Sequence, residues 1–447
     1  MYDVYVKDLI DRCDCKLIVG DINLKIENVF VNTKNTILNG TFFGIKGNKC
    51  DGSSYYKEAF FNGCNVCVLS YFNDDINKYK DKCILISDNV LLAMQKLAKY
   101  KRSLFKKEVI GVTGSIGKTT TKEIIANILS KKYNVLKTNG NLNGQIGVCL
   151  TILGLTNEDI MVIEMGISKE GEMDVITDIV RPTIAVITNV SHSHIGNFNS
   201  IYEILNEKVK ITKYANFVII NNDNKYLNDY FNNNVIKYSI KDNLTVKNIK
   251  EGIVTRFDID DLLNLQINGT KSYIYNYLAA YKVCKLLDIS NDLIKDGINN
   301  FKNVNHRLQV IEKDNSVIID DCYNASYESV KAAIKYLDKY YKEKIIVIAD
   351  ILELGKQSRK THKMIGKLIK HSNIKYVISI GNYSKAIYKL NKYKKVAKHF
   401  KCEKDSRRYL LNLINNKVVL IKGSNGMHLI NLVNYLICNI WFTLIVI

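Results

Sequence analysis

The sequence predicts an α/β protein with three domains, and three observations support this fold class. The chain has 447 residues, which exceeds one ordinary hydrophobic core and indicates two to four domains. Apolar strand-like runs alternate with helical patterns along most of the chain, as is typical of parallel sheets with crossover helices. A glycine-rich loop follows the run at 109–112. We expect a small α/β N-terminal domain, a central P-loop domain with a parallel sheet, and a doubly wound α/β C-terminal domain.

Residues 1–105 are expected to form the N-terminal domain. Short β-like runs alternate here with helical patterns, and a glycine-punctuated strand and turn lies at 41–47. The basic segment at 101–107 is expected to be a hinge into the next domain. The β-like runs lie at 16–19, 66–70 and 83–87, and the helical patterns at 55–61 and 90–100.

Residues 106–305 are expected to form the central domain. Its apolar runs are separated by helical patterns, and shorter β-like runs and two helices follow them. Because the carboxyl ends of parallel strands share one edge, the polar residues after these runs should open onto one crevice. The runs lie at 109–112, 135–137, 160–165, 184–188 and 217–220, the shorter ones at 235–240, 245–249 and 253–259, and the helices at 273–287 and 291–301.

The loop at 114–119 predicts a nucleotide phosphate site. A strand, a glycine turn and a helix N-terminus point backbone N–H groups and the helix dipole at one spot. Lys118 adds a cation, and the hydroxyl of Thr119 can reach a phosphate-bound Mg²⁺. Val112 stands where the long Walker motif needs glycine, so the shorter G-x-x-G-K-T remains. The alternative is a glycine turn that only packs, and the strand before and the helix after argue against it.

Several polar residues near the ends of strands are candidates for the same crevice. Glu164 suits a metal ligand, with a structural ion pair as the alternative. His192 or His194 could contact metal or phosphate, or be ordinary loop histidines. Arg307 and Asp321 suit phosphate and ribose recognition, although without context the sequence favours a surface or capping role for each.

Residues 306–447 are expected to form the C-terminal domain, where βα alternation resumes. The apolar tail at 436–447 is expected to follow a final amphipathic helix and to pack or touch a surface, without stable membrane insertion. The predicted strands lie at 316–320, 344–348, 376–380 and 418–422, and the helices at 327–341 and 360–371.

Composition argues against some classes of function. The chain has 64 Lys+Arg against 44 Asp+Glu, a net charge of +20, but the basic residues are scattered and nucleic acid is not an expected partner. The eleven cysteines are irregularly spaced, and buried reduced thiols are favoured over a metal or redox site at the C-x-x-C of 64–67. The N-terminus does not read as a signal peptide, and we expect a cytoplasmic protein.

Eight segments together resemble the Mur ligase family of peptidoglycan synthesis, and the resemblance spans nearly the whole chain. A short phosphate loop is itself typical of this family. The segments lie at 113–121, 138–147, 162–166, 188–194, 306–308, 320–325, 349–355 and 421–427.

The resemblance implies a central ATPase domain, a Rossmann-like C-terminal domain and a mechanism. ATP transfers its γ-phosphoryl group to a peptide carboxylate, an amine attacks the acyl phosphate, and phosphate leaves. Two Mg²⁺ ions are implied, one held by Thr119 and Glu164 and the other by His194, with a carbamylated Lys208 beside them. The residues implied to bind ATP are Gly114, Ser115, Gly117, Lys118, Thr119, Thr120, Asn276, Arg307 and Asp321.

Substrate contacts are implied as well. Thr138, Asn141 and Asn143 match a substrate-facing segment, and Lys46 lies in the N-terminal domain, which is implied to bind the UDP-sugar. The sequence departs from the family at five places. The uridine motif is reduced near 32–34, and Lys210 replaces an acidic residue. The histidine that precedes the adenine-contacting asparagine is replaced near Ser272, His306 replaces glycine, and Asn425 stands where arginine is common.

The motifs favour one type of ligase within this family, the type that adds a dipeptide. The Asp-Asn-Pro-Arg motif of the ligase that adds the third residue is absent, since the only proline is Pro182, and 350–355 matches the dipeptide-adding type. The resemblance therefore implies a monomeric ligase joining D-alanyl-D-alanine to UDP-N-acetylmuramoyl-tripeptide. The alternatives are another amino-acid-adding Mur or folylpolyglutamate-type ligase, a non-catalytic nucleotide-binding paralogue, or, as the weakest, a P-loop protein that binds nucleic acid.

Overall fold

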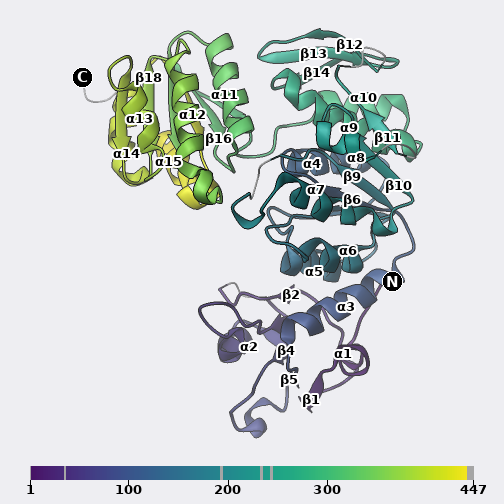
Figure 1. Cartoon of the computed structure of the whole chain (residues 1–447). Helices are drawn as coiled ribbons and strands as arrows, with labels where there is room; N and C mark the ends of the chain where they lie inside the picture. Colours follow the sequence, from purple (N-terminus) through teal and green to yellow (C-terminus); the bar gives the residue numbers. More distant parts are fainter. Residues whose placement is uncertain (1, 35–36, 192–194, 232–234, 242–244, 440–447) are drawn as a thin grey trace.

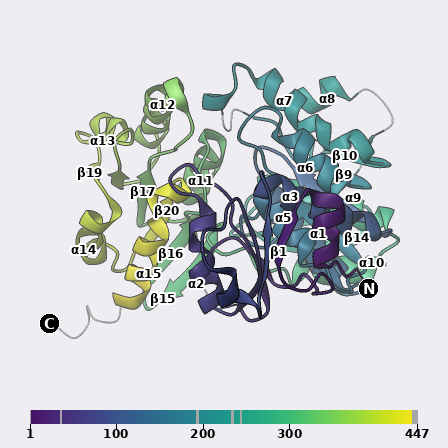
Figure 2. The ribbon, with the colours of Figure 1, turned by 90° about the horizontal axis from the view of Figure 1, so that it is seen from below.

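The computed structural model describes residues 2–34, 37–191, 195–231, 235–241 and 245–439. These residues form three α/β domains, which confirms the predicted fold class. Figure 1 shows the C-terminal domain to one side of the central domain and the N-terminal domain below it, and Figure 2, seen from below, shows the N-terminal domain in front. We propose the boundaries 1–105, 106–305 and 306–447, because a helix ends at Leu104, strand β6 begins at Val109 and strand β15 begins at Gln309.

The N-terminal sheet has the strand order β1-β5-β4-β3-β2. β1 is antiparallel to β5 and the other pairs are parallel. The predicted runs at 16–19, 66–70 and 83–87 correspond to strands of this sheet, whereas α1 and β2 had no clear sequence signal. The elements are α1 (Val6–Cys13), β1 (Lys16–Val19), β2 (Val29–Phe30), β3 (Gly40–Phe43), η1 (Gly52–Tyr55), α2 (Tyr56–Phe61), β4 (Cys64–Leu69), η2 (Ile76–Tyr79), β5 (Cys83–Ile86) and α3 (Val90–Leu104).

The start of the basic segment at 101–107 is not a solvated hinge, and that expectation was wrong. Lys101 and Arg102 are 5% and 7% exposed. Lys101 Nζ donates a 2.7 Å hydrogen bond to Leu153 O, and Arg102 Nε donates a 2.5 Å bond to Val180 O. These carbonyls end helices α5 and α6 of the central domain, where a cation meets the negative end of the helix dipole. Helix α3 therefore joins the two domains through one continuous core.

The central sheet is parallel throughout, in the order β11-β10-β9-β6-β8-β7, with a hydrophobic cluster on each face. The apolar runs that predicted β6, β8 and β9 are buried throughout, as is typical of the central strands of a parallel sheet. The elements are β6 (Val109–Thr113), α4 (Lys118–Leu129), β7 (Val135–Lys137), α5 (Gln145–Leu153), β8 (Ile160–Glu164), α6 (Glu172–Val180), β9 (Ile184–Ile187), η3 (Ile195–Asn197), α7 (Ile201–Val209), η4 (Lys210–Tyr214), β10 (Phe217–Asn221), α8 (Lys225–Tyr230) and β11 (Ile236–Tyr238).

A small antiparallel sheet follows in the order β12-β13-β14, and helices α9 and α10 return to pack on α4. Strand β14 was not predicted. Only one face of this strand is buried, so its sequence alternates between apolar and polar residues and contains no continuous apolar run. The elements are β12 (Val246–Lys250), β13 (Val254–Ile259), β14 (Leu262–Asn268), η5 (Lys271–Tyr273), α9 (Ile274–Leu286) and α10 (Asn291–Asn299).

The C-terminal sheet has the order β15-β16-β20-β17-β18-β19, parallel except for β15. Among the described residues, no helix is both long and apolar enough to cross a membrane, and the end of the predicted tail, 440–447, lies outside them. The elements are β15 (Gln309–Lys313), β16 (Ser316–Asp321), α11 (Tyr327–Tyr340), β17 (Lys344–Ala349), η6 (Gly355–Gln357), α12 (Ser358–Lys370), β18 (Tyr376–Ile380), α13 (Lys385–Asn391), β19 (Val396–Phe400), α14 (Glu403–Leu413), β20 (Val418–Lys422), η7 (Asn425–Met427) and α15 (Leu429–Asn439).

Candidate active site

The phosphate loop joins β6 to α4, as the sequence predicted. Gly114 and Gly117 have φ angles of +148° and +89°, which residues with side chains rarely adopt. A Cβ atom at Gly117 would lie 2.5 Å from Asn276 Oδ1. The Ser115 N–H donates a 2.7 Å hydrogen bond to Asn189 O, which ties the loop to the chain after β9. The positive end of the α4 dipole then faces an open cavity, as an anion site requires.

Lys118 begins α4 and is half-buried. Its ammonium group donates a 2.8 Å hydrogen bond to Gly114 O, within the loop itself. Burial lowers the pKa of Lys118, the Glu164 carboxylate opposes this shift, and the Arg307 charge adds to it. A phosphate group bound here would supply the counter-charge that two neighbouring cations lack.

Glu164 ends β8, and its side chain is buried beside the loop. Its Oε1 accepts hydrogen bonds from the Thr119 hydroxyl at 3.1 Å and from Asn143 Nδ2 at 2.8 Å. Its Oε2 is buried and has no hydrogen-bond partner among the described residues. An unpaired buried carboxylate oxygen is costly unless a cation or donor meets it. Glu164 and Thr119 therefore fit a divalent cation that prefers oxygen ligands.

The predicted substrate segment divides into two parts. Asn141 and Asn143 line the cavity next to the phosphate loop. Thr138 is fully buried, and its Oγ1 accepts a 2.9 Å hydrogen bond from the Glu164 N–H. Its carbonyl accepts a 2.6 Å bond from the buried Lys122 ammonium. Thr138 thus supports the end of β8 and is not among the cavity-lining residues.

The C-terminal domain reaches the phosphate loop through Arg307. Its Nη2 donates a 2.9 Å hydrogen bond to Thr119 Oγ1, and its guanidinium lies 4.2 Å from the centre of the Tyr323 ring. Asp321 accepts a 2.6 Å bond from Lys422, which is itself buried. The Asp321 carboxylate is therefore held in place by the same domain.

A cavity of about 1000 Å³ lies between the central and C-terminal domains. It contains most of the predicted site residues, which come from both domains. They are Ser115, Gly117, Lys118, Thr119, Thr120, Asn141, Asn143, Glu164, Asn276, Arg307 and Asp321.

Comparisons with known proteins agree with this geometry. The family description "Mur ligase middle domain" matches residues 112–284, and "Mur ligase, glutamate ligase domain" matches 306–425. The UDP-N-acetylmuramoyl-tripeptide–D-alanyl-D-alanine ligase of Haemophilus influenzae is 31% identical over 92% of this chain and 93% of its own. That of Bacillus subtilis is 32% identical over the same shares. The chain belongs to the Mur ligase family.

Solved Mur ligases share the whole fold. MurF from Acinetobacter baumannii has a TM-score of 0.86 at 25% identity, covering 97% of this chain and 98% of its own. The MurF ligase of Thermotoga maritima in complex with ADP has a TM-score of 0.80 at 26% identity, covering 93% and 98%. The cavity of this Mur ligase is thus set in a fold that binds adenine nucleotide in a relative.

Lys208 lies on α7 of this Mur ligase and is 1% exposed. Burial lowers its pKa well below the usual range, the Lys118 charge lowers it further, and Glu207 partly opposes the shift. Glu207 is engaged elsewhere, because it pairs with Lys210 at 2.6 Å and accepts a bond from the Met173 N–H. The family's acidic residue is replaced by Lys210, which forms ion pairs with Glu207 and Asp174.

Other predicted residues lie apart from the cavity or outside the description. Lys46 is exposed in the N-terminal domain and does not line the cavity. His192 and His194 lie outside the described residues. Sequence reasoning missed Tyr323, whose ring lies under Arg307, although an aromatic residue within the 320–325 motif was a usable signal. It also missed the 3.3 Å hydrogen bond from Gly196 N to Glu353 O, which joins the two domains. This bond is between backbone atoms, so no pattern of side chains in the sequence signals it.

Proposed function

We propose that this Mur ligase joins D-alanyl-D-alanine to UDP-N-acetylmuramoyl-tripeptide at the expense of ATP. Relatives 31–32% identical over 92% of the chain have this named activity. The observation that carries the proposal to this chain is the Glu164 carboxylate, held beside Lys118 and Thr119 at a phosphate loop. Such a centre suits phosphoryl transfer to a carboxylate, which is a poor acyl donor until phosphorylation supplies a leaving group.

The loop residues of this chain hold the ATP phosphates in the proposal. Lys118 exchanges its bond to Gly114 O for a phosphate oxygen, and the free N–H groups at the start of α4, beside the cavity-lining Gly117 and Thr120, face the same anion. Lys118 then opposes the charge that gathers when an anionic carboxylate approaches an anionic phosphate.

Thr119 and Glu164 would hold one Mg²⁺, and the unpaired Glu164 Oε2 supports this assignment. We assign the second ion to His194, as the family resemblance implies. Bound Mg²⁺ would neutralise the phosphate charge during transfer. Asn143 holds Glu164 Oε1 at 2.8 Å, so it orients the carboxylate and leaves Oε2 free.

Lys208 is proposed to be carbamylated. Burial lowers the pKa of its amine, which favours the neutral form that attack on CO₂ requires. The amine nitrogen forms a bond to the CO₂ carbon and loses one proton, which leaves a carbamate anion. This anion would place a negative charge close to the Lys118 ammonium, where an unmodified Lys208 ammonium would repel it.

The C-terminal domain is proposed to complete the nucleotide site. Arg307 extends from this domain to Thr119, and Asp321 and Asn276 face the same cavity from its two sides. Asn141 and Asn143 are proposed to contact the peptide substrate, and Thr138 acts through the Glu164 backbone. Lys46 is assigned to the UDP-sugar in the N-terminal domain, and we place the monomeric enzyme in the cytoplasm.

One assay tests the proposal. Purified protein with ATP and Mg²⁺ is given UDP-N-acetylmuramoyl-tripeptide, with lysine or diaminopimelate as third residue, and ADP release is followed with and without D-alanyl-D-alanine. We expect release that depends on both substrates, together with the pentapeptide product by mass spectrometry. Replacement of the dipeptide by L-glutamate tests a folylpolyglutamate-type or glutamate-adding activity. ADP release that never depends on both substrates would overturn the ligase assignment.

A further inference from the structure

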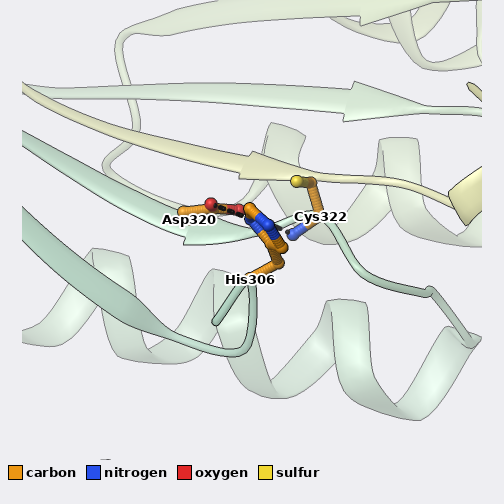
Figure 3. A group of neighbouring side chains, drawn as sticks. All are labelled: His306, Asp320 and Cys322. Atoms are coloured by element: carbon orange, nitrogen blue, oxygen red, sulfur yellow. Dashed lines mark hydrogen bonds and ion pairs between the residues drawn. The ribbon is translucent and has the colours of Figure 1, made fainter. Parts of the chain in front are cut away.

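A group of three potential metal ligands lies beside the cavity but does not line it. His306 is in the turn before β15, Asp320 is near the end of β16, and Cys322 follows that strand (Figure 3). One ligand atom from each residue lies within 4.8 Å of the others. Because His306 stands where the family resemblance implies glycine, this group depends on a residue that departs from the family pattern.

The three side chains are held in place before any ion binds. Asp320 Oδ2 lies 2.6 Å from His306 Nδ1, and Asp320 Oδ1 accepts a 3.2 Å bond from the Cys322 N–H. The His306 carbonyl accepts a 3.1 Å bond from the Tyr323 N–H, and its own N–H donates to Gln309 Oε1 at 3.2 Å. Hydrogen bonds that orient ligands in this way accompany most protein metal sites.

We propose that His306, Asp320 and Cys322 bind a zinc ion. Imidazole nitrogen, carboxylate oxygen and thiolate sulfur are the ligand types that Zn²⁺ takes in proteins, whereas Mg²⁺ prefers oxygen alone. Bond lengths of about 2.0–2.3 Å place tetrahedral ligands about 3.3–3.7 Å apart, so shifts of about 1 Å form the site. The partly exposed edge of His306 leaves room for water as fourth ligand.

Charge and protons balance in this site. Asp320 is fully buried, and its Oδ2 lies 2.6 Å from His306 Nδ1. Burial and the Asp320 carboxylate hold the pKa of the Cys322 thiol well above its usual range. Zinc binding displaces to solvent the thiol proton and any proton on the coordinating His306 nitrogen, and the ion then replaces His306 as the partner of the Asp320 carboxylate. The nearby Lys422 ammonium is paired with Asp321 at 2.6 Å, so its charge is already compensated.

The position of the site gives the ion a structural effect. His306 precedes Arg307, and the structure holds Arg307 on Thr119 of the central domain. An ion that ties His306 to the end of β16 fixes the turn from which Arg307 projects. This role is separate from the proposed ligase reaction, since none of the three residues lines the cavity.

The test is Co²⁺ binding to the reduced, metal-free, full-length protein. We expect one equivalent of Co²⁺ to produce a thiolate-to-cobalt charge-transfer band with the visible bands of tetrahedral Co²⁺, and added Zn²⁺ to remove them. The magnesium site at Glu164 contains no sulfur, so it cannot produce the charge-transfer band. Zn²⁺ affinity is then measured by competition against a chromophoric chelator. Loss of one ligand should weaken Zn²⁺ binding by more than about 10-fold, since mutation of a residue that only hydrogen-bonds to a ligand already weakens metal binding by about that factor.

Two variants and two controls make the result decisive. Cys322→Ser should abolish the charge-transfer band, and His306→Gly should weaken binding without unfolding, because His306 has a φ of +64° that glycine adopts freely. Cys402→Ser, at an exposed cysteine, and Glu164→Gln, at the proposed magnesium site, should keep the band. Absence of the band in the folded wild-type protein, or a band unchanged in both His306→Gly and Cys322→Ser, would overturn the zinc site.

Discussion

The Arg307 guanidinium donates a hydrogen bond to the Thr119 hydroxyl, and the same hydroxyl donates to Glu164. This chain of contacts joins the C-terminal domain to the phosphate loop and to the end of β8. Arg307 and Thr119 are 188 residues apart in sequence. The contact therefore depends on how the two domains lie together, and it connects domain position with the phosphate site.

Arg307→Ala should reduce ligase turnover by about 100-fold, the loss typical of removing one preorganised donor at a developing charge. Arg307→Lys should recover little, because an ammonium cannot reproduce the planar stacking on Tyr323. Steady-state kinetics with ATP varied is the measurement. Arg256→Ala, on the exposed face of β13, is the control and should behave as wild type. Wild-type kinetics in Arg307→Ala would contradict the role.

Thr119→Val should raise the Mg²⁺ concentration needed for half-maximal activity and lower turnover, because it keeps the shape and removes the ligand oxygen. Thr119→Ser retains the hydroxyl and should stay close to wild type. Activity titrated against Mg²⁺ at saturating ATP gives the comparison. Equal Mg²⁺ requirements in the two variants would rule out Thr119 as a ligand.

Glu164→Gln should abolish turnover but leave the fold intact. The amide keeps the size of the side chain, and removal of a buried charge with an unpaired oxygen should not lower the melting temperature measured without Mg²⁺. Mg²⁺ should then stabilise the wild type in the presence of a non-hydrolysable ATP analogue, but not the variant. Thermal melting with and without Mg²⁺ distinguishes these cases, and equal stabilisation of both proteins would remove Glu164 from the metal site.

Lys208→Ala should lose ligase activity, whereas Lys213→Ala, at an exposed lysine paired with Asp178, should retain it. Growth or assay with ¹³C-bicarbonate should give a carbamate carbon signal in the wild type alone. Added bicarbonate should raise the activity of a partly decarbamylated sample. Full activity in Lys208→Ala would exclude the carbamate role.

Lys101 predicts a pH dependence of stability. Burial lowers the pKa of Lys101 from 10.5 to about 8 in the folded protein. Between these values the unfolded chain binds more protons than the folded one, so the free energy of unfolding should rise with pH from 8 to 10.5. The full shift corresponds to roughly 3 kcal/mol as an upper bound. Denaturant unfolding of wild type and Lys101→Met across this range tests it, and identical pH slopes would contradict it.

The sequence predicted the central sheet and the loop well, for a physical reason. Strands such as β6 and β9 are buried on both faces, so they read as continuous apolar runs. Strand β14 exposes alternate residues and β15 lies at a sheet edge, so neither gave such a run. Sequence motifs identified most residues that line the cavity. They did not predict that residues of the central and C-terminal domains would contact one another there.

Charged residues were harder to place than apolar ones. Lys101 and Arg102 stand in a basic run typical of solvated segments, yet both are buried because helix ends of another domain accept their hydrogen bonds. Similarly, Thr138 matched a substrate motif, but its hydroxyl oxygen accepts a hydrogen bond from the backbone N–H of Glu164. Partners of this kind depend on tertiary contacts that no local pattern encodes.

The buried end of α3 has a consequence for synthesis on the ribosome. Lys101 bonds to a carbonyl 52 residues downstream, and Arg102 to carbonyls 78 and 79 residues downstream. Until those residues have emerged, Lys101 lacks its carbonyl acceptor, Arg102 has only its bond to Phe105 O, and the apolar face of the last turn of α3 is uncovered. The N-terminal domain therefore cannot finish folding when its own last residue leaves the tunnel, and a fragment ending at residue 105 should aggregate or recruit chaperones during translation.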